Sequence, residues 1–325
     1  KDKTKSNNLN QTCKGVIIEE DGENVKLVSH SINNSIDFEE FKELVPFRYC
    51  VIEDNLDGTL INLYFYKGKW NISTRYMIDA DKSKYRSKIS FGEKFKELVD
   101  IEKLEIEKNY TYTFLLNFKE NRHVKDVLKD EIYHIESTNN ITGEKIYLNI
   151  GIKHPKILDI KINKNVNNYN NLEDYLKKMN WWEKGVMIYS KDRKYRCNLK
   201  CEKYKEVESL VKNQSDVRFI LLEGIYYKKN INDILMYYPE WVDNSIEVKD
   251  DLEKLLDEIN STYILKYCQK KDILVKEKHE KLYRNLHKLY KIRKETDSRA
   301  RLEKKDIREY LLGLDCEYLF TIIYK

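Results

Sequence analysis

Residues 49–66 read YCVIEDNLDGTLINLYFY, and the expected fold follows from this stretch. Apolar, β-branched and aromatic residues predict a short strand up to Glu53 and a longer one over residues 60–66. Asp57-Gly58 lies between them and is typical of a turn. Strands joined by short polar turns are therefore expected in this part of the chain.

The same pattern continues on both sides. Further strands are predicted at residues 15–18, 25–28, 70–73, 110–116 and in a hairpin over 185–199, and helices at about 91–99 and 172–179. Runs of hairpin strands with a few helices predict an antiparallel α+β domain.

After about Asn213 the pattern changes to helical spacing. Leu282, Leu286 and Leu289 recur at i, i+4 and i+7, with Lys and Arg between them. We therefore expect one domain over residues 1–213 and an all-helical domain over residues 214–325. The basic stretch 270–305 is either the solvated face of an amphipathic helix or a surface that contacts a phosphate backbone.

Composition limits the classes of function. The chain has 325 residues, of which 41% are hydrophobic and 35% charged, as in a soluble globular protein. Lys and Arg number 60 against 55 Asp and Glu, so the formal net charge is only +5. This small excess excludes the coating of a polyanion by diffuse charge, and any nucleic-acid surface must be local.

The six cysteines form no C-x-x-C pair and no histidine stands at zinc-finger spacing, so we expect reduced thiols and no metal site. The sequence shows no signal peptide and no apolar run long enough to span a bilayer. We expect a cytoplasmic protein without a membrane partner.

The turn after Glu53 has the frame of a covalent nucleotidyl-transfer motif. That chemistry needs an amine nucleophile on a rigid turn, with carboxylates and cations around a triphosphate. Lysine–adenylate ligases supply the amine in the pattern K-x-D-G. Here Asp57-Gly58 is present, but Asn55 occupies the nucleophile position. This tetrapeptide alone is a weak signal.

Blocks on both sides of this turn resemble phage-type RNA ligase 1, the family that reseals broken tRNA anticodon loops. They are Cys13-Lys14-Gly15-Val16-Ile17, Ser73-Thr74-Arg75, segments 110–116 and 121–124, Lys184-Gly185-Val186-Met187, and Asn198-Leu199-Lys200 with Tyr204. Segments 232–238 and 318–323 are similar to the C-terminal tRNA-recognition domain of that family. The resemblance covers nearly the whole chain and implies an antiparallel-sheet nucleotidyltransferase domain followed by a helical domain.

Four positions that carry chemistry in the family differ here. The resemblance places Asn55 where the family lysine takes AMP, and Leu115 where a glutamate holds the ribose. It places Lys184 where a glutamate supports the metal–nucleotide site, and Asn198 where a lysine polarises the triphosphate. An engineered substitution of Asn55, made to trap a substrate complex, is an alternative, but it would not account for Leu115 and Asn198. The resemblance therefore implies a catalytically degraded member.

The basic and structural positions of the motifs are retained. They are Lys14, Asp57, Gly58, Arg75, Arg122, Lys200 and Tyr204. Retention of cations with loss of carboxylates should favour phosphate in the pocket. We also expect five separated residues to meet in one cleft, namely Asn55, Leu115, Lys184, Asn198 and Lys200.

Asparagine cannot replace lysine as the nucleophile, because its amide nitrogen is delocalised and non-basic. A relocated lysine, Lys200 or Lys184, is the alternative, although a displacement of about 1 Å can cost on the order of a hundredfold in rate. Glu183 poses a second question. Strand alternation turns it away from the cleft, and only a bulge near Gly185 would bring it inward, to the place of the family glutamate.

The expected function is a ligase-like pseudoenzyme that binds RNA, either tRNA or its broken anticodon loop, or a protein partner. By analogy with the family, that partner is a tRNA-cleaving toxin and the protein is an immunity factor. No cofactor is expected for such a protein. The alternative is an active ATP-dependent RNA ligase for tRNA repair, with ATP and Mg²⁺, and a third hypothesis is a structural subunit that uses only the fold.

Overall fold

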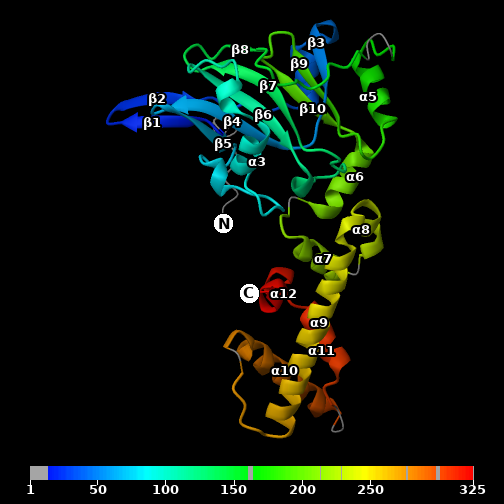
Figure 1. Cartoon of the computed structure of the whole chain (residues 1–325). Helices are drawn as coiled ribbons and strands as arrows, with labels where there is room; N and C mark the ends of the chain where they lie inside the picture. The colour runs from blue at the N-terminus through cyan, green and yellow to red at the C-terminus, as the bar shows by residue number, and fades with distance from the viewer. Residues whose placement is uncertain are drawn as a thin grey trace. The chain divides into compact units, whose positions relative to one another are not determined.

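The computed structural model describes residues 14–159, 164–212, 214–227, 229–275, 277–297 and 301–324 (Figure 1). The chain separates into two compact units, with the division after Lys212. In the described residues, all strands belong to the first unit, and the second unit is helical. None of the described helices combines the length and apolar character that crossing a membrane requires.

The larger sheet has five antiparallel strands in the order β5-β4-β6-β7-β8. Their bounds are β4 Thr59–Tyr66, β5 Lys69–Thr74, β6 Tyr110–Asn117, β7 Glu131–Asn139 and β8 Lys145–Ile146. Asn62 of β4 pairs with Ser73 of β5 and with Thr113 of β6. Residues that pair directly point to the same side of a sheet, so these polar residues share one face.

The opposite face of this sheet is apolar, because side chains alternate along each strand. Ile61 of β4 and Phe114 of β6 are fully buried there, in a core with Phe95 of α3 (Phe91–Leu98). The Ser90 side chain caps that helix. The apolar face thus anchors the sheet and leaves the polar face available for a site.

The smaller antiparallel sheet has the order β10-β9-β3, and its strands are β3 Cys50–Asp54, β9 Gly185–Ser190 and β10 Arg196–Lys200. Met187 of the central strand pairs with Glu53 on one side and with Asn198 on the other. Arg196 and Asn198 are two residues apart, so alternation places them on one face. A separate hairpin joins β1 Ile17–Asp21 to β2 Asn24–Ser29.

Short helices complete the first unit. They are α2 Phe38–Leu44, α5 Tyr169–Lys177, α6 Glu202–Val211 and the 3-10 turns Phe47–Tyr49, Ala80–Lys82, Ile101–Lys103 and Lys119–Asn121. The ring of Tyr169 packs edge-on against Phe38 and Phe47, with centroids 5.7 and 5.0 Å apart. Only Cys201 separates the end of β10 from the start of α6, which brings Tyr204 close to the end of the smaller sheet.

The second unit packs its helices around one apolar core. They are α7 Val217–Tyr226, α8 Ile231–Tyr237, the 3-10 turn Pro239–Trp241, α9 Val242–Tyr263 with a π-helical extension Ile264–Cys268, α10 Glu277–Thr296, α11 Lys304–Leu312 and α12 Cys316–Tyr324. Leu256, Leu286 and Leu319 are fully buried in that core. Leu282 is buried one turn before Leu286, as their spacing predicts.

The predicted α+β class, with antiparallel sheets followed by helices, is confirmed. The sequence did not predict β7, α2 or α6. β7 shows no alternation of buried and exposed side chains, because three consecutive residues, His134, Ile135 and Glu136, are all buried. Cys13, which begins the first resembling block, lies outside the described residues.

Candidate functional site

Asn55 lies directly after β3, at the predicted nucleophile position. Its side-chain amide donates to Oδ1 of Asn198 over 2.6 Å, and its backbone N–H donates to the carbonyl of Gly185 over 3.2 Å. Asn55 is only 6% exposed, whereas Asn198 on β10 is exposed. Asn55 and Asn198, the two positions where the sequence resemblance implies lysines, therefore form a neutral pair of amides.

Asp57 is the buried anion of the site. Its Oδ1 accepts a hydrogen bond from the Tyr204 hydroxyl and lies 3.3 Å from Nζ of Lys184, and its Oδ2 accepts from the backbone N–H of Lys125. Burial raises the pKa of Asp57, but the Lys184 charge and the Tyr204 hydrogen bond outweigh burial, so the pKa lies below its usual range. Lys184 also donates to the Leu56 carbonyl over 3.2 Å. Lys184 thus neutralises Asp57 and is not a free cation.

Gly58 is required by the path of the chain after Asp57. Its φ is +145°, and a Cβ at this position would lie 2.5 Å from the carbonyl oxygen of Leu116. Any side chain would collide with β6 and strain the backbone. Glycine therefore lets this turn pass close to β6 while Asp57 reaches Lys184 and Tyr204.

Leu115 closes the site with apolar surface. It is buried and packs with Ile32 and Ile135, and Leu56 and Leu60 contact the same cluster. Since this side chain has no hydrogen-bonding atom, it cannot hold a ribose hydroxyl as a glutamate would.

Asn55, Leu115, Lys184 and Asn198 line one cavity of about 150 Å³, together with Arg196. These four residues come together as expected, although they are far apart in the sequence. Small-molecule sites usually enclose about 300–1,000 Å³, so this cavity is too small for a whole nucleotide.

Lys200 does not line this cavity, contrary to prediction. Its ammonium forms an ion pair of 2.6 Å with Glu208 in the second turn of α6, and it lines a neighbouring hollow together with Asn198. The prediction that the retained cations lack carboxylate partners is therefore wrong at Lys200. Its partner Glu208 belongs to none of the sequence motifs, whereas Lys184 pairs with the motif residue Asp57.

Lys14, Arg75 and Arg122 line neither the 150 Å³ cavity nor the larger one described next. The Lys14 ammonium lies 4.4 Å from the centre of the exposed Tyr76 ring. Arg75 donates from Nη2 to Oδ1 of Asn34, and Arg122 donates to the Val124 carbonyl from Nε and Nη2. These three cations therefore do not share the pocket of Asn55.

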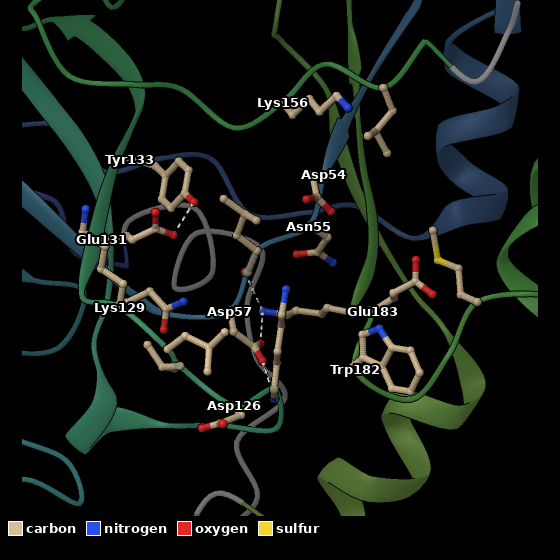
Figure 2. Close-up of a pocket in the computed structure, with 18 of the residues that line it drawn as sticks. Asp54, Asn55, Asp57, Asp126, Lys129, Glu131, Tyr133, Lys156, Trp182 and Glu183 are labelled. Carbon is tan, nitrogen blue, oxygen red and sulfur yellow. Dashed lines mark hydrogen bonds and ion pairs between the residues drawn. The ribbon is translucent and has the colours of Figure 1, made fainter. Parts of the chain in front are cut away.

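A larger cavity of about 600 Å³ opens beside Asn55 (Figure 2). Asn55, Asp57 and Lys184 form one part of its wall. The charged residues of its remaining wall are Asp54, Asp126, Glu131, Glu183, Lys125, Lys129 and Lys156, and its aromatic residues are Tyr133, Tyr175 and Trp182. Most of these residues belong to segments outside the family motifs, so the sequence did not predict this wall. Its size suits a nucleotide, but its charge is mixed rather than cationic.

Glu183 also lines the larger cavity, next to Lys184. It accepts hydrogen bonds from the backbone and side chain of Asn180. Strand alternation does not separate Glu183 from Lys184, because both residues precede β9, which begins at Gly185 with φ of +128°. Both side chains therefore reach the wall. Among the described residues, no three His, Cys, Asp or Glu side chains are grouped so as to hold a metal ion.

No protein-family model matches the chain. A stretch of 96 residues is 36% identical to the immediate-early protein ICP-46 homolog of Invertebrate iridescent virus 3, and it covers 26% of this chain and 21% of that protein. The chain thus spans about a fifth of this curated relative.

Solved structures of ATP-dependent RNA ligases resemble the chain with low TM-scores and low sequence identities. An archaeal ATP-dependent RNA ligase in one form gives a TM-score of 0.45 and 12% identity, over 66% of this chain and 56% of that one. A second form of an archaeal ATP-dependent RNA ligase gives a TM-score of 0.42 and 11% identity, over 74% of this chain and 70% of that one. An RNA ligase of Naegleria gruberi gives a TM-score of 0.39 and 9% identity, over 54% of this chain and 57% of that one. These RNA ligases are structural neighbours of the chain, which spans little more than half of the first.

Proposed function

We propose that this protein is an RNA ligase-like pseudoenzyme that binds RNA and carries no covalent adenylate. The observation that carries the proposal is the pair of contacts at the nucleophile position. Asn55 is hydrogen-bonded to Asn198, and the nearby amine of Lys184 is tied to Asp57 and to the Leu56 carbonyl. The polar side chains at this position are paired with one another, and no free amine is presented to a nucleotide.

The chemistry of attack on ATP supports this reading. An amide nitrogen cannot attack the α-phosphorus. For Lys184 to attack, it would have to lose its proton and leave Asp57 as a buried, unpaired charge. Leu115 offers no partner for a ribose hydroxyl. Each of these features opposes adenylate formation.

The RNA part of the proposal rests on the motif resemblance and on one surface of the second unit. Lys281, Arg284, Lys288 and Lys291 are exposed on α10, at spacings of three, four and three residues. Such residues lie along one side of a helix, and a stripe of cations suits a phosphate backbone. The resemblance points to tRNA or its broken anticodon loop, and to an immunity role against a tRNA-cleaving toxin.

The test uses the whole chain. Incubation with radiolabelled ATP and Mg²⁺ should give no labelled protein after denaturing electrophoresis. Titration with intact tRNA, with tRNA cut in the anticodon loop and with an unrelated RNA should show salt-dependent binding that favours one of the tRNAs. If the protein binds no RNA, the remaining functions are binding of a toxin protein and a structural role.

Lys184 favours one second candidate, an active ligase with a relocated nucleophile. Its side chain lines both the small and the large cavity, beside Asn55. If label appears on the protein, Lys184→Arg should abolish it, because arginine keeps the charge opposite Asp57 but cannot form the lysyl adenylate. Lys125→Arg, at another lysine of the large cavity, is the matched control and should leave the label unchanged.

A further inference from the structure

β10 is an edge strand of the smaller sheet. It pairs with β9 on one side, and within the described part of the chain no strand pairs with its other side. An edge strand presents backbone N–H and C=O groups to which another extended chain can add. The outer side of β10 is therefore a candidate interaction surface.

The hydrogen bonds near the end of β10 show which of its residues turn their backbone groups outward. The Cys201 N–H donates to the Lys184 carbonyl, so Cys201 bonds toward β9. Backbone groups alternate in direction along an antiparallel strand. The residues at even positions, Arg196, Asn198 and Lys200, therefore direct their backbone groups away from β9.

One of these outward residues has a partner. The Ile36 N–H donates to the Arg196 carbonyl over 2.9 Å, which confirms the direction of Arg196. Among the described residues, neither Asn198 nor Lys200 has a backbone hydrogen-bond partner on that side. Asn198 is exposed and Lys200 is half-buried. The edge is thus open beyond Ile36.

A hollow of about 560 Å³ lies along this open edge, and we call it the β10 groove. β10 forms one wall, and residues of α2, α5 and α6 form the others. Ile36, Phe38 and Leu199 supply apolar surface and are half-buried, so part of each is accessible. An open strand edge beside a groove suits an extended peptide, because the edge bonds to its backbone and the groove takes its side chains.

The charges of the β10 groove favour a basic occupant. Its three lysines all have carboxylate partners at 2.6–2.8 Å, in the pairs Lys177–Asp174, Lys200–Glu208 and Lys205–Glu202. Asp37 and Glu173 also line the groove, and neither forms an ion pair with a described residue. The hydrogen bond to Glu39 raises the pKa of Lys42, and the charges of Glu173 and Asp37 raise it further. Both carboxylates thus lie near a lysine that is already paired.

We propose that the β10 groove binds an extended segment of a partner protein, which adds a strand to β10 and directs a lysine or arginine toward Asp37 and Glu173. Apolar side chains of that segment pack against Ile36, Phe38 and Leu199. RNA does not suit this groove, because the two carboxylates repel phosphate groups. The proposal goes beyond RNA binding and does not depend on it.

The experiment measures binding of a fluorescent peptide to the full chain by anisotropy. The peptide Val-Val-Lys-Lys-Val-Val-Lys-Lys presents valine and lysine alternately on each face of a strand. It should bind. The same peptide with all backbone nitrogens methylated has lost its donors, and a version with glutamate in place of lysine has the wrong charge. Both should bind about tenfold more weakly or worse.

Lys200→Pro tests the strand edge. Proline removes the outward N–H, and its ring obstructs an added strand, whereas the bonds to β9 belong to the neighbouring residues and are kept. Lys200→Ala loses the same ion pair with Glu208 but keeps the N–H, so it is the matched control. Lys200→Pro should bind the lysine peptide about tenfold more weakly than Lys200→Ala. Circular dichroism verifies that both variants are folded.

Asp37→Asn combined with Glu173→Gln tests the charge. Asparagine can still cap α2, as the Asp37 side chain does. This double variant should weaken binding of the lysine peptide by about fivefold and strengthen binding of the glutamate peptide. Glu40→Gln removes an exposed carboxylate of α2 that does not line the groove, and it should have no effect.

Equal binding of the lysine peptide and its methylated form would overturn the proposal, as would equal binding by folded Lys200→Pro and Lys200→Ala. The methylated peptide leaves the protein unchanged, so this comparison decides even where Lys200→Pro does not fold. A chain that binds no peptide but self-associates in sedimentation, with Lys200→Ala associating and Lys200→Pro monomeric, would also overturn it. The occupant of the edge would then be a second copy of the chain.

Discussion

Replacement of Lys184 by methionine should destabilise the first unit by about 3 kcal/mol. The Lys184 ammonium lies 3.3 Å from the Asp57 carboxylate, and the exposed fractions of the two side chains are 18% and 5%. At an effective dielectric constant of about 20, that separation corresponds to an attraction of about 5 kcal/mol. Asp57 would keep its hydrogen bonds from Tyr204 and from the Lys125 backbone, so we expect the lower end of the range of about 3–5 kcal/mol for breaking a buried pair.

Urea denaturation followed by circular dichroism measures this free energy of unfolding. Lys194→Met removes a lysine that is exposed beside the β9–β10 turn, and it should cost less than about 0.5 kcal/mol. Asp57→Asn in the Lys184→Met background should recover most of the loss, because the buried charge is gone. A loss below about 1 kcal/mol for Lys184→Met would refute the view that this cation holds Asp57 ionised.

Three further outcomes are expected. Asn55→Lys alone should give little covalent adenylate from labelled ATP. The same change combined with Leu115→Glu, Lys184→Glu and Asn198→Lys should give more, because such groups act as a unit. Strong labelling of the single variant would contradict this expectation. Burial and the charge of His154 lower the pKa of His134 to about 3, from 6.5 for the free side chain, so the unfolded chain takes up the proton first as the pH falls. His134 should therefore contribute a loss of about 2 kcal/mol of stability from pH 7 to pH 5. The pKa of His123 is also lowered by burial, to about 4, so His134→Asn should reduce the slope in urea denaturation without abolishing it; an unchanged slope would exclude a contribution from His134. Lys281→Glu with Lys288→Glu on α10 should weaken RNA binding and reduce its dependence on salt, measured by titration at two salt concentrations; unchanged affinity would place the RNA surface elsewhere.

Strands that are dense in apolar, β-branched and aromatic residues could be predicted from the sequence. Residues 60–66 were expected as a strand on this basis and form most of β4. β7 could not be predicted in the same way. Its His134 and Glu136 are buried through partners on other segments, the Leu148 carbonyl and Lys145, and such contacts leave no pattern along the chain.

The candidate site was predicted in part. The motifs brought together Asn55, Leu115, Lys184 and Asn198, because strand order fixes which motif residues face each other. The partners of the cations could not be predicted. Lys200 pairs with Glu208, because α6 follows β10 after Cys201 and its second turn brings that carboxylate within reach.

The most direct test of the central claim is the covalent labelling of the full chain by α-labelled ATP with Mg²⁺. The arrangement of Asn55, Asn198, Lys184 and Asp57 predicts no label that survives denaturation. A labelled protein whose adduct is mapped to Lys184, or to any other lysine of the large cavity, would contradict the pseudoenzyme account.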